Sequence, residues 1–173
     1  MRDMTGRPTC RSVLTAMGAA ALARRGHGGG VMAADHRIMA GADLDGSVNG
    51  SVATTGLDRL FVLMRNASRG RGTTREEFWW HLRGWRRSPR PRASGHRTRT
   101  DLSPLMRQLD RALPLPPEAV DAMTDAIGTI TADRAVVVGR AWQGAFFDLH
   151  PRCRDRRVLS GPSPRFPEIE FVP

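Results

Sequence analysis

Asp45 and His96 are the residues of this sequence whose types and positions best suit acid–base chemistry. Asp45 follows an apolar segment, residues 38–42, that is predicted as a buried strand, and His96 follows Gly95 in a later loop. In open α/β sheets, functional groups gather beyond the carboxyl ends of the strands. A carboxylate there can orient an imidazole, which takes a proton from a hydroxyl nucleophile. The two residues therefore predict the acid and the base of a nucleophilic hydrolase.

The hydroxyl that this pair needs is missing. Such hydrolases place a serine at the centre of Gly-x-Ser-x-Gly, on a sharp turn between a strand and a helix. The sequence has Gly26-His27-Gly28-Gly29-Gly30, ahead of Asp45 and His96 in the chain order nucleophile, acid, base. Its central position is Gly28. Removing the nucleophile of a triad costs about 10⁶-fold in rate, so the sequence predicts little or no activity through a serine.

Both members of the pair have simpler interpretations. Asp45 could be a turn residue ahead of Gly46, because aspartate favours turns. Asp43 is an alternative acid, since it lies two residues away on the same side of an extended chain. His96 could be an ordinary loop residue. The sequence leaves these alternatives open.

The remaining candidate groups predict no metal or cofactor. The other histidines lack metal-ligand spacing, two cysteines are too few for a disulfide scaffold, and the glycine run lacks the lysine and serine of a phosphate-binding loop. His27 would only precede the nucleophile position, and the others are expected at the surface. The residues concerned are His27, His36, His81, His150, Cys10 and Cys153.

Apolar periodicity predicts the elements that must position the pair. Residues 60–64 are a second buried strand, and the capping box from Thr74 to Glu77 starts a helix that runs to about residue 83. Residues 85–93 are expected to form an edge or broken strand, because Pro89 and Pro91 remove two donors. The aromatic residues of this region and of the last helix are expected in the core rather than in a lipid pocket: Phe78, Trp79, Trp80, Trp85 and Trp142.

Three helices and an extended tail are predicted to follow. The helices cover residues 102–113, 117–127 and roughly 131–149, and the spacing of leucines in the first predicts one buried face. The tail, residues 160–173, is proline-rich and is expected to lie extended on the surface. The element order indicates an α/β fold, and specifically half of an α/β sheet that looks like the C-terminal part of something larger.

The chain resembles a known family over residues 26–173, in order. The similar segments are Met32-Ala33-Ala34-Asp35, Ala40-Gly41-Ala42-Asp43-Leu44-Asp45-Gly46, Gly56-Leu57-Asp58-Arg59, Phe61-Val62-Leu63-Met64, Ser94-Gly95-His96, Thr100-Asp101-Leu102, Ala145-Phe146-Phe147-Asp148 and Gly161-Pro162-Ser163-Pro164-Arg165-Phe166-Pro167-Glu168. They resemble secreted actinobacterial α/β-hydrolases related to platelet-activating-factor acetylhydrolase and to small lipases.

The resemblance implies a carboxylic ester hydrolase acting on small, acetyl or short-chain lipid esters without a cofactor. It implies that Asp45 is the triad acid and His96 the base, and it aligns the nucleophile with Gly28. It also implies an incomplete α/β-hydrolase fold, made of the C-terminal strands and helices of a mostly parallel sheet. The family's early strands and first oxyanion donor are then not among these residues. The activity is therefore expected to be weak or absent.

Residues 1–23 are predicted as an export signal or, alternatively, as an Ala-rich helix, and residues 24–173 as the hydrolase portion. A positive start, the apolar run of residues 13–23 and an Ala-Leu-Ala end are typical of a signal peptide, here with a degenerate twin-arginine pattern. The predicted location is extracellular, with the cytoplasm as the alternative. No apolar run approaches the ~18 residues that span a bilayer.

The charge suggests a second, non-catalytic hypothesis. The chain of 173 residues carries a formal charge of +10, and all 27 of its basic residues are arginine. Eleven of them lie between Arg65 and Arg99. A pseudo-hydrolase remnant with a basic, anion-binding surface is therefore the alternative, and peripheral lipid contact stays possible. No nucleic-acid motif is present, so a nucleic-acid partner is not expected. The oligomeric state is left open.

Overall fold

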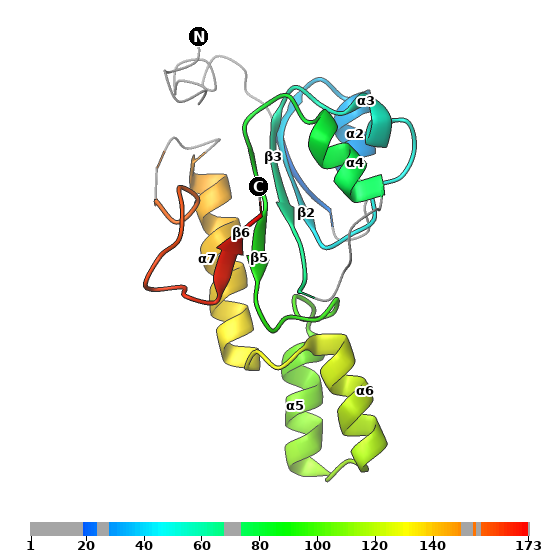
Figure 1. The fold of residues 1–173 in the computed structure, drawn as a ribbon, viewed down its shortest axis with the longest axis vertical. Coiled ribbons are helices and arrows are strands. Elements are labelled where there is room, and N and C mark those ends of the chain that lie inside the picture. The colour runs from blue at the N-terminus through cyan, green and yellow to red at the C-terminus, as the bar shows by residue number, and fades with distance from the viewer. Residues whose placement is uncertain (1–18, 24–27, 68–73, 150–153, 155–156, 173) are drawn as a thin grey trace.

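A parallel sheet forms the centre of the computed structural model, which describes residues 19–23, 28–67, 74–149, 154 and 157–172. Its strands are β1 (Ala19–Ala23), β2 (Ile38–Leu44), β3 (Leu60–Met64) and the short β4 (Arg86–Arg87), side by side in chain order. Helices lie on both sides of it (Figure 1). The predicted α/β class is confirmed.

Strand β1 occupies the end of the segment for which an export signal or an Ala-rich helix was expected. It pairs in parallel with β2 and places Ala23 beside Asp43. Alanine favours helices in isolation, and pairing with β2 overrides that preference. Residues 1–18 lie outside the described part of the chain, so the export signal stays a prediction.

Alternate residues of β2 and β3 face two different helix layers. Phe61 and Leu63 pack with α2 (Gly28–Ala34), α3 (Val52–Thr55) and α4 (Thr74–His81) on one side. Leu60, Val62 and Met64 pack against α7 (Ala132–Leu149) on the other side. All five residues of β3 are buried, as expected for a parallel strand with cover on both faces.

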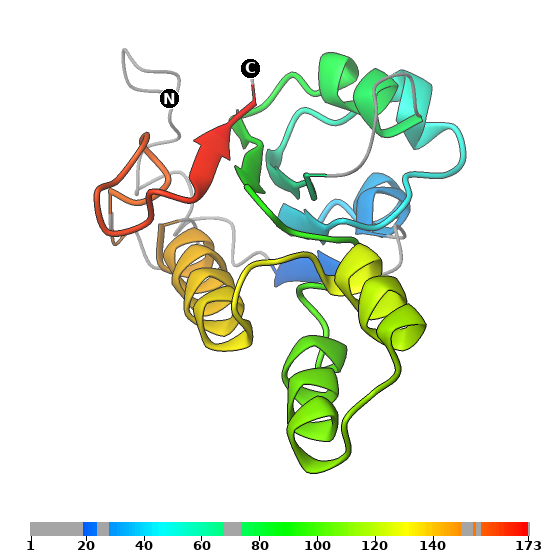
Figure 2. The ribbon, with the colours of Figure 1, turned by 60° about the horizontal axis from the view of Figure 1, so that its bottom comes forward.

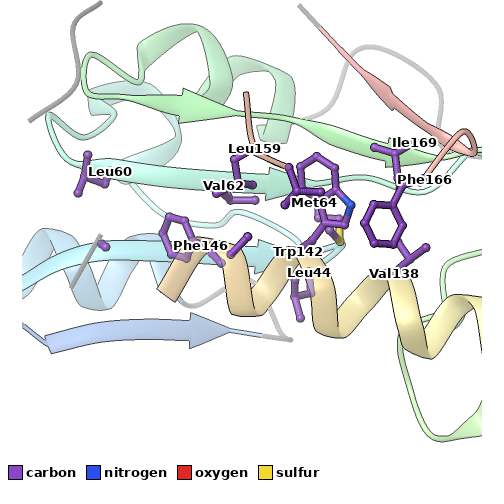
Figure 3. Close-up of a cluster of buried hydrophobic side chains, with 14 of the residues drawn as sticks. Leu44, Leu60, Val62, Met64, Val138, Trp142, Phe146, Leu159, Phe166 and Ile169 are labelled. Atoms are coloured by element: carbon purple, nitrogen blue, oxygen red, sulfur yellow. The ribbon is translucent and has the colours of Figure 1, made fainter. Parts of the chain in front are cut away.

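The core between the sheet and α7 also includes the C-terminal tail (Figure 3). Trp142 and Phe146 of α7 are almost fully buried there, together with Phe166 and Ile169 of the tail. Residues Ile169–Phe171 form β6, which pairs in an antiparallel manner with β5 (Pro89–Pro91). The prediction of a surface tail is therefore wrong for this part, because the tail supplies apolar cover that α7 alone leaves incomplete.

The segment with two prolines forms the edge strand that the sequence predicted. The N–H of Phe61 donates to the carbonyl of Trp85 at 2.9 Å, and the N–H of Arg65 donates to the carbonyl of Pro89 at 3.2 Å. Pro89 thus contributes its carbonyl, the group that proline keeps. The strand is divided into β4 and β5 at Ser88, whose carbonyl accepts from the N–H of Val172 instead.

A helical hairpin, α5 (Leu102–Ala112) and α6 (Pro117–Ile127), projects away from the sheet (Figures 1 and 2). The predicted buried face of α5 is wrong: Leu105, Leu109 and Leu113 are 58%, 42% and 63% exposed. The periodicity marks an amphipathic helix correctly, but it does not say whether a partner surface lies opposite.

The aromatic prediction is confirmed with one exception. Phe78, Trp79, Trp85 and Trp142 are buried, whereas Trp80 is 63% exposed. Successive residues of an α-helix lie about 100° apart around its axis, so Trp79 of α4 can enter the core while Trp80 faces solvent. Among the helices of the described residues, none is long and apolar enough to cross a membrane.

Candidate active site

Asp45 lies in the turn immediately after β2, with its side chain fully buried. Its backbone has a φ of +66°, a left-handed conformation that aspartate tolerates better than most residues. Its N–H donates to the carbonyl of Met64 at 2.9 Å, which ties the turn to the end of β3. The carboxyl edges of two neighbouring strands therefore fix the position of this carboxylate.

The structure brings Asp45 and His96 together. Nδ1 of His96 lies 2.8 Å from Oδ2 of Asp45, across 51 positions of sequence. The Asp45 side chain is 0% exposed and the His96 side chain 52% exposed. Because a carboxylate accepts hydrogen bonds, this contact assigns the proton to Nδ1 in the neutral ring and leaves Nε2 with a free lone pair. The pair has the geometry of an oriented general base.

Two further residues, Arg75 and Asn66, hold the same carboxylate. Nη1 of Arg75 donates to Oδ1 of Asp45 at 2.8 Å, and Nη2 of Arg75 donates to the carbonyl of Gly46. Asn66 donates its N–H to Oδ1 at 3.3 Å and its side-chain amide to Oδ2 at 2.5 Å. Together with His96, these groups give Asp45 four donors, so its buried charge is well compensated.

Sequence reasoning missed Arg75 and Asn66 for different reasons. Asn66 comes directly after the β3 segment, and strand ends of a parallel sheet meet at one edge, so its position was a usable signal. Arg75 lies one residue into the helix that the capping box at Thr74 predicts. A capping box indicates where a helix begins, but it does not indicate which strand end the first turn of that helix packs against. It therefore could not place Arg75 beside Asp45.

Asp43, the alternative acid, has another role in the structure. Its Oδ1 accepts from the N–H of Gly46 at 2.5 Å and so braces the turn that presents Asp45. Its Oδ2 is buried and has no hydrogen-bond partner among the described residues. Burial raises the pKa of Asp43 above its usual value. The residue that contacts His96 is thus Asp45, through its Oδ2, and not the alternative acid Asp43.

We expect Asp43→Asn to flatten the pH dependence of stability. Because burial raises the pKa of Asp43, the folded protein holds this proton to higher pH than the unfolded chain does. The free energy of unfolding then falls as pH rises from about 4, the unfolded pKa, through the folded pKa. An amide still accepts from Gly46 but does not titrate. Urea melts over this pH range should show the free energy of unfolding of the variant rising relative to that of the native protein as pH rises. Parallel pH profiles of the two free energies would contradict a raised pKa of Asp43.

The loop that carries His96 is anchored against the end of α6. A Cβ at Gly95 would lie 2.5 Å from the carbonyl oxygen of Ala126, so only glycine fits beside the histidine. Oγ1 of Thr98 donates to the carbonyl of Ile127 at 2.6 Å, and the N–H of Gly95 donates to Oγ1 of Thr98 at 2.7 Å. These bonds fix the loop on both sides of His96.

Arg99 ties the same loop to the sheet. Its Nη2 donates to the carbonyl of Arg65 at 2.6 Å, just beyond β3. Burial lowers the pKa of Arg99 to about 10, while the nearby carboxylates Asp45 and Asp43 oppose that shift. The guanidinium therefore remains charged at neutral pH and adds positive potential beside the two buried aspartates.

Gly28, predicted as the nucleophile position, follows the carboxyl end of β1 in the chain. β1 ends at Ala23, opposite Asp43 of β2, and α2 begins at Gly28. β1 thus precedes the glycine-rich segment and α2 begins within it, while residues 24–27 lie outside the described part of the chain. The sequence had not indicated a strand there. α2 is short, at seven residues, in agreement with the little chain available before β2.

The other predicted groups form no site in the described part of the chain. His36 and His81 are exposed, as predicted, and contact Arg59 and the carbonyl of Glu77 respectively. No group of three or more histidines, cysteines, aspartates or glutamates among the described residues could hold a metal ion. The candidates outside the described residues are Cys10, His27, His150 and Cys153.

Many arginines of the basic segment bond to the protein itself. Besides Arg75 and Arg99, Arg86 donates to the carbonyl of Leu82, and Arg87 donates to the carbonyl of Leu159 at 3.1 Å. The guanidinium of Arg86 also lies 4.9 Å from the ring centre of Trp79. Several arginines of this segment therefore hold turns and strand ends of the protein itself.

Comparison with known proteins places this fold among esterases. No family model matches the sequence, and neither does any curated protein. Among solved structures, a ferulic acid esterase from Streptomyces cinnamoneus matches with a TM-score of 0.73 and 29% sequence identity. The match covers 88% of this chain and 46% of the esterase, so the chain spans about half the length of that protein. The chain is thus similar to a partial α/β-hydrolase-like esterase segment.

Proposed function

We propose that this chain is a carboxylic ester hydrolase segment that carries the acid and the base of a catalytic triad, Asp45 and His96. The single observation that carries the proposal is the 2.8 Å contact between Nδ1 of His96 and the buried carboxylate of Asp45. The esterase-like fold supports it. The hydrolase acts weakly, because Gly28 supplies no hydroxyl at the nucleophile position.

The proposed substrates are small esters, with acetyl or short acyl groups. The resemblance to platelet-activating-factor acetylhydrolase and small lipases supports lipid and acetyl esters, and the ferulic acid esterase adds aromatic acyl groups. His96 is 52% exposed, so an ester carbonyl can approach the ring from solvent. Acid–base chemistry at this pair requires no cofactor.

His96→Ala should reduce ester hydrolysis to the background level. General acid–base catalysis contributes about 10²- to 10⁴-fold, and alanine removes the base while leaving Asp45 with Arg75 and Asn66. The measurement is the release of p-nitrophenolate from p-nitrophenyl acetate, with ethyl ferulate as a second substrate. His81→Ala is the matched control, because His81 is exposed and its ring contacts the carbonyl of Glu77 in its own helix.

Equal rates for the native protein, His96→Ala and His81→Ala would remove His96 from the chemistry. A melting curve for each variant accompanies the assay, since a lower rate from an unfolded protein says nothing about the base. Both substitutions remove an imidazole ring, so a difference between the hydrolysis rates of the two variants reflects where that ring lies in the fold.

A further inference from the structure

We propose that His96 activates water directly, so that this protein hydrolyses esters without a covalent acyl-enzyme. The inference rests on the proposed function of the Asp45–His96 pair and concerns the identity of its nucleophile. A serine hydrolase uses the pair to deprotonate its own hydroxyl. Here the corresponding position is Gly28, and a glycine has no side chain that could attack.

The hydroxyls nearest to His96 in sequence are committed to other bonds. Oγ of Ser94 donates to the carbonyl of Pro91 at 2.6 Å, and Oγ1 of Thr98 donates to the carbonyl of Ile127 at 2.6 Å. Both side chains are buried, at 1% and 4% exposure. No hydroxyl hydrogen-bonds to His96 among the residues that the structure describes. Among these described residues, His96 is therefore not paired with a nucleophilic side chain.

The free face of His96 is open to solvent. Its Nδ1 contacts the buried carboxylate of Asp45, yet 52% of the side chain remains exposed. Nε2 lies on the other side of the ring and carries the lone pair. Asp45, with four donors around it, stays oriented toward Nδ1 and stabilises the imidazolium that forms when Nε2 takes a proton. Because this side of the ring faces solvent, a water molecule is the nucleophile available to His96.

The reaction then has two steps. The water oxygen forms a bond to the ester carbonyl carbon, its proton passes to Nε2 of His96, and the carbonyl π electrons move to the carbonyl oxygen. The tetrahedral intermediate re-forms its carbonyl and breaks the bond to the leaving oxygen, which takes the proton from Nε2. A carboxylic acid and an alcohol leave, and the ring returns to its neutral form.

The test compares the native protein with Gly28→Ser on p-nitrophenyl acetate. A covalent route releases a burst of p-nitrophenolate equal to the enzyme present and leaves an acetylated protein in the mass spectrum. For the native protein we expect a His96-dependent steady rate with no burst, no acetyl adduct and no labelling by a fluorophosphonate. The rate should fall in heavy water, because a proton moves in the rate-determining step.

A burst, an adduct or a label on the native protein would overturn the water route, because it would identify a protein nucleophile. An absence of His96-dependent hydrolysis by the native protein would overturn it too. The Gly28→Ser arm separates the two proposals: if only this variant shows His96-dependent hydrolysis, Asp45 and His96 are a competent acid–base pair as proposed, but the water route of the native protein fails. If neither protein shows it, both fail.

Discussion

Gly28→Ser should raise the rate of ester hydrolysis by about 100-fold or more. The resemblance aligns position 28, the first residue of α2, with the nucleophile, so the substitution would supply the hydroxyl that the Asp45–His96 pair lacks. An intramolecular nucleophile held beside its base avoids the entropy cost of bringing in water. The roughly 10⁶-fold that a complete triad supplies is the upper bound on this gain.

Two controls make the expected gain specific. Gly28→Ala adds a Cβ without a hydroxyl and should not raise the rate. His96→Ala in the Gly28→Ser background should abolish the gain, because an unassisted serine is a weak nucleophile. The measurement is kcat/KM for p-nitrophenyl acetate. A gain that survives the loss of His96 would contradict the proposed pairing of position 28 with this base.

Arg75→Met should cost about 3–5 kcal/mol of folding free energy, the usual result of removing one partner from a buried ion pair. Arg75 and Asp45 are 5% and 0% exposed in their side chains. Methionine fills much of the volume but leaves the carboxylate without its cationic partner. For a domain of this size the loss corresponds to a fall in melting temperature of roughly 6–20 °C. Thermal and urea melts measure it.

Arg37→Met is the matched control, because Arg37 also donates to an aspartate, Asp35, but at the surface. Exposed pairs contribute little, so this variant should melt close to the native protein. Arg75→Lys should recover only part of the stability, since one ammonium does not reproduce the planar fork that reaches both Asp45 and Gly46. Equal melting temperatures for Arg75→Met and Arg37→Met would show that the buried pair does not stabilise the fold.

Local patterns predicted most of the elements. The five apolar residues of β3 and the apolar periodicity of α7 are properties of short segments, and both elements formed where expected. The edge strand around Pro89 followed from the missing donors of proline. The failures share one cause. The burial of α5 and the path of the C-terminal tail depend on which distant surface lies opposite, and no local pattern contains that information.

The candidate site divides in the same way. Residue types and chain order alone determined that a carboxylate and an imidazole were available and that position 28 lacked a hydroxyl. The tertiary structure decided which aspartate contacts His96, because the turn after β2 directs Asp45 to the histidine and Asp43 to the N–H of Gly46. It also brought Arg75 and Asn66 to the same carboxylate. The contacts of Asp45 with Asn66, Arg75 and His96 join residues 21 to 51 positions apart, and such residues meet only when strands and helices pack.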